Sequence, residues 1–146
     1  MHGPTQMPQR RAEGGHAVIE MAFLMPWVLF LFAGTFDLGF CEYSLIATQN
    51  AARGAAMYTS QGSTTAADST TACTYAVREL AGLPGTSGLS TCGASPVVVT
   101  DSSVTGPDGA RASQVSVTYT TFQLIPIPGL SVNYAITRTA EMRLQT

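Results

Sequence analysis

The chain has 146 residues, of which 45% are hydrophobic and only 11% are charged. This length suits one domain of ordinary size, or a smaller domain with an anchor. All seven positive charges are arginines and the formal net charge is −2, so the chain lacks the basic face that nucleic-acid binding needs, and no nucleic acid is expected as a partner.

An apolar segment lies near the N-terminus. Residues 21–36 are uncharged and mostly apolar, and with residues 17–19 they make about 20 helical positions, or about 30 Å of helix. That length is enough to cross the hydrocarbon core of a bilayer. Arg10 and Arg11 precede the segment and Asp37 follows it. The positive-inside rule therefore predicts a cytoplasmic N-terminus and an exported C-terminal part, with Asp37 solvated at the outer end.

Two kinds of cleaved signal do not fit this segment. A secretory signal peptide needs small residues soon after its apolar core, whereas residues 35–40 read Thr-Phe-Asp-Leu-Gly-Phe. A lipoprotein signal needs a small residue before its cysteine, whereas Cys41 follows Phe40. A plain signal anchor accounts for everything except Glu20, a carboxylate at the cytoplasmic start of the span. Such an acid is costly near hydrocarbon and by default marks a functional residue.

Cys73 and Cys92 lie in the polar C-terminal part. If this part is exported, they form a natural disulfide pair closing a loop of about 20 residues, worth about 3 kcal/mol. The alternative interpretation is two unpaired buried thiols. No C-x-x-C pair or Cys/His cluster occurs in the sequence, so no metal site is predicted.

A catalytic constellation is not found in the sequence. Both histidines, His2 and His16, precede the apolar segment, so the exported part has no base for a Ser-His-Asp or Cys-His arrangement. No glycine-rich phosphate loop follows a predicted strand. We therefore expect no catalytic residue, no cofactor and no small-molecule substrate, and the chain is not expected to be an enzyme.

From Leu38 to about Tyr58 the pattern stays helical and contains no proline, so the anchor is expected to continue as one long helix. Small residues crowd this part, namely Ala47, Ala51, Ala52, Gly54, Ala55 and Ala56. They suit close packing in a bundle or filament core, and equally the docking of the helix on its own sheet. Both interpretations stand.

The exported part is expected to begin with a second helix over residues 66–81. Asp68 or Ser69 is expected to cap its start, and Gly82 lies where it should end. Its predicted buried stripe is Ala72, Tyr75, Ala76, Val77 and Leu80. Residues 82–96 read as a loop that holds Cys92.

Three strands are predicted to follow. The first opens with residues 96–100 and precedes a turn at 106–109, and the others lie at 114–121 and 132–144. The last two alternate with period two, which favours an antiparallel sheet with one face against the helices. The predicted inward residues are Val115, Val117, Tyr119 and Thr121, then Val132, Tyr134, Ile136, Ala140, Met142 and Leu144. Arg138 falls on the same face without an evident partner. The apolar connection 124–130 packs on the core or forms an interaction patch.

The fold expected from these elements is α+β. A long N-terminal transmembrane helix continues into a small exported domain with a short helix and a three- to four-stranded antiparallel sheet.

The stretch Arg10–Phe23 resembles the leader of TadE-like proteins, minor pilins or pseudopilins of the Tad (Flp, type IVc) pilus assembly system. The resemblance continues through Phe36–Gly39 and Asn50–Ala56, and it extends from the N-terminus to about Tyr58. It implies a pilin-like fold, cleavage by a prepilin peptidase between Gly15 and His16, and a role in assembling an adhesive pilus.

The expected division follows from this resemblance: residues 1–15 are a cytoplasmic leader, 16–58 a transmembrane and emergent helix, and 59–146 the exported domain. Cleavage would make Glu20 the fifth residue, one helical turn from a new α-amino group. Glu20 is then a candidate register or recognition acid, since an unpaired carboxylate in low dielectric is heavily penalised. The alternative is that Glu20 reaches the lipid headgroups.

The leading functional hypothesis is a minor subunit or assembly factor of a Tad pilus in the bacterial inner membrane, with its exported domain periplasmic or extracellular. Its expected partners are a prepilin peptidase, other pilin-like subunits, inner-membrane Tad assembly proteins and membrane lipid. Whether the chain enters the filament is left open. The alternative is a single-pass, membrane-anchored binding module with no pilus role.

Overall fold

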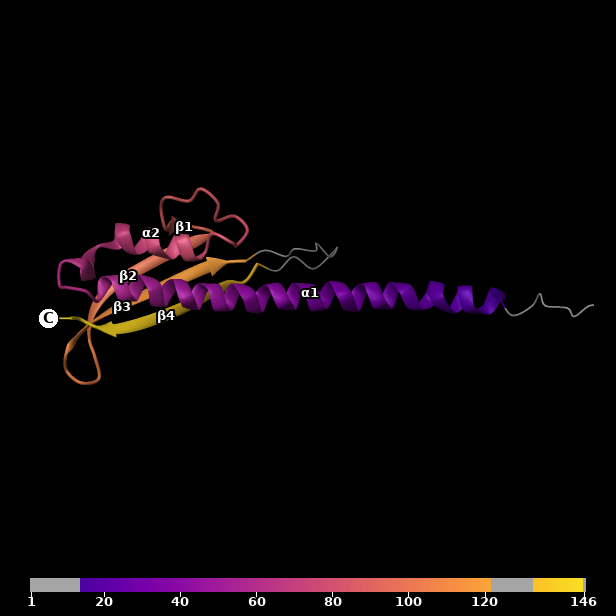
Figure 1. Cartoon of the computed structure of the whole chain (residues 1–146), viewed down its shortest axis with the longest axis horizontal. Helices are drawn as coiled ribbons and strands as arrows, with labels where there is room; N and C mark the ends of the chain where they lie inside the picture. The colour runs from indigo at the N-terminus through magenta and orange to yellow at the C-terminus, as the bar shows by residue number, and fades with distance from the viewer. Residues whose placement is uncertain (1–13, 122–132, 146) are drawn as a thin grey trace, which may run out of the picture. The chain divides into compact units, whose positions relative to one another are not determined.

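The computed structural model describes residues 14–121 and 133–145. The chain divides into two compact units, Met1–Phe36 and Asp37–Thr146. The helices and strands, labelled in Figure 1, are α1 (Gly14–Thr59), η1 (Thr65–Ala67), α2 (Ser69–Glu79), β1 (Gly93–Ala94), β2 (Val97–Thr105), β3 (Arg111–Thr120) and β4 (Ala135–Arg143). The expected α+β fold is confirmed.

Every described residue of the first unit belongs to α1. Its large apolar side chains are exposed, as shown by Phe23 at 76% and Trp27 at 70%. Pro26 lies inside the helix without ending it. The predicted long apolar N-terminal helix is therefore confirmed.

The second unit contains one antiparallel sheet in the order β1-β2-β3-β4. Val115 of β3 lies at its centre, opposite Asp101 of β2 and Ala140 of β4. The two-residue strand β1 lies within the segment 82–96, which sequence reasoning assigned to a loop. It pairs Gly93 with Val98, a pairing too short to leave a periodic signal in the sequence.

The alternation predicted for β3 is correct. Val115, Val117, Tyr119 and Thr121 are all buried. On the other face, two pairs of hydroxyl side chains hydrogen-bond across the strands at 2.9 Å, namely Ser116 with Thr139 and Thr118 with Thr137. One face of the sheet is thus part of the core and the other is polar.

The prediction for the last strand is partly wrong. Ile136 and Leu144 are buried, but Tyr134 is 56% exposed because it precedes the first residue of β4. Arg138 lies half-buried opposite Val117. Val132 and the apolar connection 124–130 lie outside the described residues.

Strand β2 begins within its predicted opening, and its polar second half continues to pair with β3 as far as Thr105 opposite Arg111. The predicted turn follows it. The N–H of Gly109 donates to the carbonyl of Gly106 at 3.0 Å, and Gly109 has φ +76°, which favours glycine.

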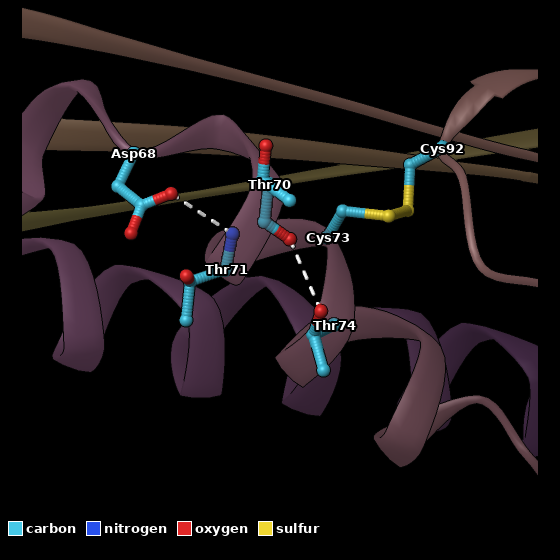
Figure 2. Close-up of a disulfide and its surroundings, with 6 residues drawn as sticks. All are labelled: Asp68, Thr70, Thr71, Cys73, Thr74 and Cys92. Carbon is cyan, nitrogen blue, oxygen red and sulfur yellow. Dashed lines mark hydrogen bonds between the residues drawn. A yellow bond between two sulfur atoms is a disulfide. The ribbon is translucent and has the colours of Figure 1, made fainter.

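Helix α2 is shorter than the predicted range 66–81, and η1 occupies part of the difference. Its cap is Asp68, whose side chain accepts a hydrogen bond from the Thr71 N–H at 3.0 Å (Figure 2). The predicted stripe is buried at Ala72, Ala76 and Leu80. Tyr75 is 41% exposed instead and stacks on Tyr58 of α1, with ring centroids 5.0 Å apart.

The core of the second unit lies between the sheet and the two helices. Figure 2 shows α2 beside α1, with strands passing behind α2. The α1 side of this core consists of small residues, namely Ala47, Ala51, Ala52, Ala55 and Ala56, and the sheet contributes Val97, Val115, Val117 and Tyr119. Small side chains on α1 allow close approach, so the docking interpretation of the small residues holds within the chain.

Candidate membrane anchor and assembly helix

Gly15 and His16 lie in the first turn of α1, which begins at Gly14. His16 is exposed. A methyl group placed on Gly15 would have no atom within 4 Å. The peptide bond between these two residues therefore belongs to an uncrowded helix end.

Glu20 lies on α1 one turn beyond His16, and its side chain is exposed. Within residues 14–121 and 133–145 its carboxylate has no ion-pair partner. The pairing of Glu20 with an α-amino group stays a prediction.

The apolar span following Glu20 contains one polar side chain, Thr35. The Thr35 hydroxyl donates to the carbonyl of Leu31 one turn back, at 2.8 Å. A hydroxyl satisfied within its own helix can enter hydrocarbon at little cost. The span is therefore compatible with a bilayer in composition, length and hydrogen bonding.

Asp37 is the first residue of the second unit and is half-buried. Its Oδ1 atom is buried and has no hydrogen-bond partner among the described residues. The sequence interpretation of a solvated acid at this position is therefore incomplete, because one carboxylate oxygen is shielded from solvent.

Beyond Asp37, α1 turns a polar as well as a small-residue face toward the core. Ser44, Thr48 and Thr59 are fully buried. Each hydroxyl donates to a carbonyl of its own helix, at 2.9, 2.7 and 3.2 Å respectively. Sequence reasoning missed this set. The signal that was available is spacing, since all three residues share a face with the buried alanines.

A disulfide joins Cys73 of α2 to Cys92 in the segment before β1 (Figure 2). Cys41 on α1 is free and half-buried. The segment closed by the disulfide has a second attachment. The hydroxyl of Tyr119 donates to the carbonyl of Pro84 at 2.9 Å, and burial raises the pKa of Tyr119.

The part of the chain that the structure describes has at least two surface pockets. It contains no group of three or more His, Cys, Asp or Glu side chains that could hold a metal ion. A pocket of about 340 Å³ is lined by Ser63, Ala66, Asp101, Ser102, Ser103 and Arg111. A second, of about 310 Å³, is lined by Cys73, Thr74, Val77, Arg78, Leu89 and Ser90. The first pocket has the hydroxyls of Ser63, Ser102 and Ser103 and the carboxylate of Asp101 among its lining residues, and no histidine lines either pocket.

These observations define a class of protein: a small α+β domain together with, among the described residues, one helix long and apolar enough to cross a membrane. That combination fits a membrane-anchored protein. Residues 15–57, less than a third of the chain, match the family model of TadE-like protein. The resemblance seen in the sequence is thereby confirmed, and it associates the chain with the Tad pilus. Searches of curated proteins and of solved structures find no match.

Proposed function

We propose that this chain is a minor pilin-like subunit or assembly factor of a Tad (Flp) pilus. The observation that carries the proposal is the family match, which begins at Gly15 and runs through the apolar span to Met57. The role is structural, and its partners are a prepilin peptidase, other pilin-like subunits and the inner-membrane Tad assembly proteins. The exported domain supplies no chemistry to the pilus.

The proposed location is the bacterial inner membrane. The proposed orientation has the N-terminus in the cytoplasm. The charges on either side of the span support it, because Arg10 and Arg11 precede the span whereas Asp37 and Glu42 follow it. Residues 1–15 would then be cytoplasmic, and residues 59–146 would lie in the periplasm or outside the cell. Residues 16–58 would anchor the chain in lipid and carry the domain away from the surface.

Processing is the second part of the proposal. A prepilin peptidase would cut between Gly15 and His16, which leaves the α-amino group of His16 one helical turn before Glu20. Side chains one helical turn apart are neighbours. The new positive charge can therefore pair with the Glu20 carboxylate in the same chain, or with that of an adjacent subunit.

Deletion and complementation in the cells that make the protein test its role in the pilus. Cells without the gene should assemble few or no pili, measured in the sheared surface fraction, and the wild-type gene should restore them. The Glu20→Gln gene should restore few pili, because the substitution removes the negative charge proposed to pair with an α-amino group in low dielectric. Glu79→Gln, an exposed acid on α2, is the matched control and should restore them fully.

Normal pili in the deleted cells would contradict the proposal. That result would favour the alternative function, a membrane-anchored binding module with no part in the pilus. Equal restoration by the Glu20 and Glu79 variants would remove the role proposed for Glu20.

A further inference from the structure

The second half of strand β2 has an unpaired side. On the side away from β3, the pairing with β1 covers Val97 and Val98. From Thr100 to Thr105, no strand among the described residues pairs with this side. We call residues 100–105 of β2 the free edge. A strand edge of this kind presents backbone N–H and C=O groups to which another extended chain can bind.

A hydrogen bond at the start of β2 shows which backbone groups point toward the free edge. The N–H of Val99 donates to the carbonyl of Cys92 at 3.0 Å, on the side away from β3. The register with β3 is continuous over Val97–Thr105, and the backbone groups of successive strand residues point to alternate sides. The N–H and C=O groups of Asp101 and Ser103 therefore also point away from β3.

A hollow of about 340 Å³ lies beside the free edge. It is lined by Ser63, Ala66, Asp101, Ser102, Ser103 and Arg111. Three consecutive residues of β2 line this hollow, although the side chains of neighbouring strand residues point to opposite faces of a sheet. The hollow thus reaches the backbone between them, and an added chain has room beside the outward N–H and C=O groups.

Two opposite charges face this hollow. Asp101 is half-buried and Arg111 is exposed. Asp101 lies opposite the buried Val115, and Arg111 precedes Val115 by four residues on β3, so both side chains leave the sheet on the face that carries the core. Neither charge forms an ion pair with any residue of the described ranges. Both are therefore available to a bound molecule.

We propose that the free edge binds an extended segment of a partner protein as an added antiparallel strand. The segment carries a basic side chain opposite Asp101 and an acidic side chain opposite Ser103, within reach of the Arg111 guanidinium. Directly opposite residues of an antiparallel pair can exchange two backbone hydrogen bonds, and antiparallel pairing is the more stable per residue. In this direction the acidic residue precedes the basic residue by two positions.

The two kinds of contact have different roles. Backbone hydrogen bonds to Asp101 and Ser103 supply affinity for any extended chain, whereas the side chains at alternate positions select the sequence. A guanidinium can hold a carboxylate through two parallel hydrogen bonds, so Arg111 selects the acidic position. Asp101 selects the basic one. The partner is thus recognised by its extended conformation and by the order of its two charges.

Peptide binding to the full chain in detergent micelles tests the proposal. The probe is a fluorescent peptide, Thr-Glu-Val-Arg-Thr, acetylated and amidated to remove its terminal charges, and binding is measured by fluorescence polarisation. N-methylation of the Glu and Arg residues of the peptide removes the N–H groups that face β2 and should abolish binding. N-methylation of the central Val is the matched control, because its N–H points away from β2.

Variants of the protein test the two charges. Asp101→Asn and Arg111→Gln should each weaken binding about fivefold. Arg53→Gln, at an exposed arginine on α1, is the matched control and should leave binding unchanged. A chain with both Asp101→Arg and Arg111→Glu should instead prefer the peptide Thr-Arg-Val-Glu-Thr, in which the charges are exchanged.

Three results would overturn the proposal. The first is no binding of the probe up to about 1 mM. The second is equal loss of binding from N-methylation at the central and the flanking positions, a comparison that needs no substitution in the protein. The third is self-association of the chain that Asp101→Asn weakens and the peptide does not compete with, since a second copy would then occupy the free edge.

Discussion

Ser113 of β3 donates a hydrogen bond to the hydroxyl of Thr59, the last residue of α1, across 2.6 Å. Both side chains are fully buried. The Thr59 hydroxyl in turn donates a hydrogen bond to the carbonyl of Ala56 at 3.2 Å. One residue further on, the carbonyl of Ser60 accepts from the N–H of Gln145 at 2.8 Å. The end of α1 is therefore attached to both the sheet and the C-terminal segment.

Removing the Ser113 hydroxyl should destabilise the α+β domain. Ser113→Ala leaves a buried acceptor on Thr59 without its donor, which costs about 1 kcal/mol. Ser116→Ala is the matched control, because Ser116 pairs with Thr139 on the exposed face. Chemical unfolding of the full chain in detergent measures the free energy of unfolding of both variants. Equal decreases in the two variants would show that the buried hydrogen bond contributes no more to stability than the exposed one.

The disulfide should be a major contribution to stability. Replacing Cys73 and Cys92 by serine together should lower the free energy of unfolding by about 3 kcal/mol, because the open loop gains entropy in the unfolded state. Cys41→Ser should change it by less than about 1 kcal/mol, since a half-buried serine is tolerated there. Non-reducing peptide mapping checks the bond itself, and free thiols at both positions in protein isolated from membranes would contradict this account.

The acid stability of the domain should depend on Asp68. Hydrogen bonds from the Thr71 side chain and from the Thr71 N–H are the largest causes that lower the pKa of this carboxyl, and Tyr58 and the Thr70 N–H add to them against desolvation. A pKa lower in the folded state than its unfolded value of 3.8 means that folding releases protons. The contribution is therefore complete above pH 3.8 and is lost as pH falls through the folded pKa.

Asp68→Asn isolates the charge, because asparagine also caps helices. We expect thermal unfolding of the variant to begin at lower temperature than wild type near neutral pH, and the difference to vanish in acid below the folded pKa. Melting curves across this range measure the effect. If the difference in melting temperature between variant and wild type is the same at every pH, the charge on Asp68 does not cause that difference.

Much of the fold follows from local patterns in the sequence. The buried set of β3 was predicted from alternation, since a strand with one face in the core requires period two. Asp68 was predicted as one of two possible caps, because its carboxylate can accept from the first turn of α2. The turn at residues 106–109 was predicted from glycine, which at Gly109 supplies the positive φ.

The remaining features depend on partners distant in sequence. The polar half of β2 is a strand only because β3 pairs with its backbone, which no side-chain pattern in β2 reveals. Tyr75 fits the buried face of α2 by spacing, yet it lies at the surface because Tyr58 offers it a ring to stack on. The buried oxygen of Asp37 likewise depends on neighbours that its position at the end of the span does not indicate.

The mass of the mature N-terminus tests the central claim most directly. The full chain is expressed with and without a prepilin peptidase, isolated from membranes, and its intact mass is measured. We predict loss of residues 1–15 only with the peptidase, with His16 as the new first residue. Gly15→Ala should keep the leader, whereas Gly34→Ala should not, although both add a methyl group where no atom lies within 4 Å. An N-terminus that stays intact in the wild type with active peptidase would contradict the account.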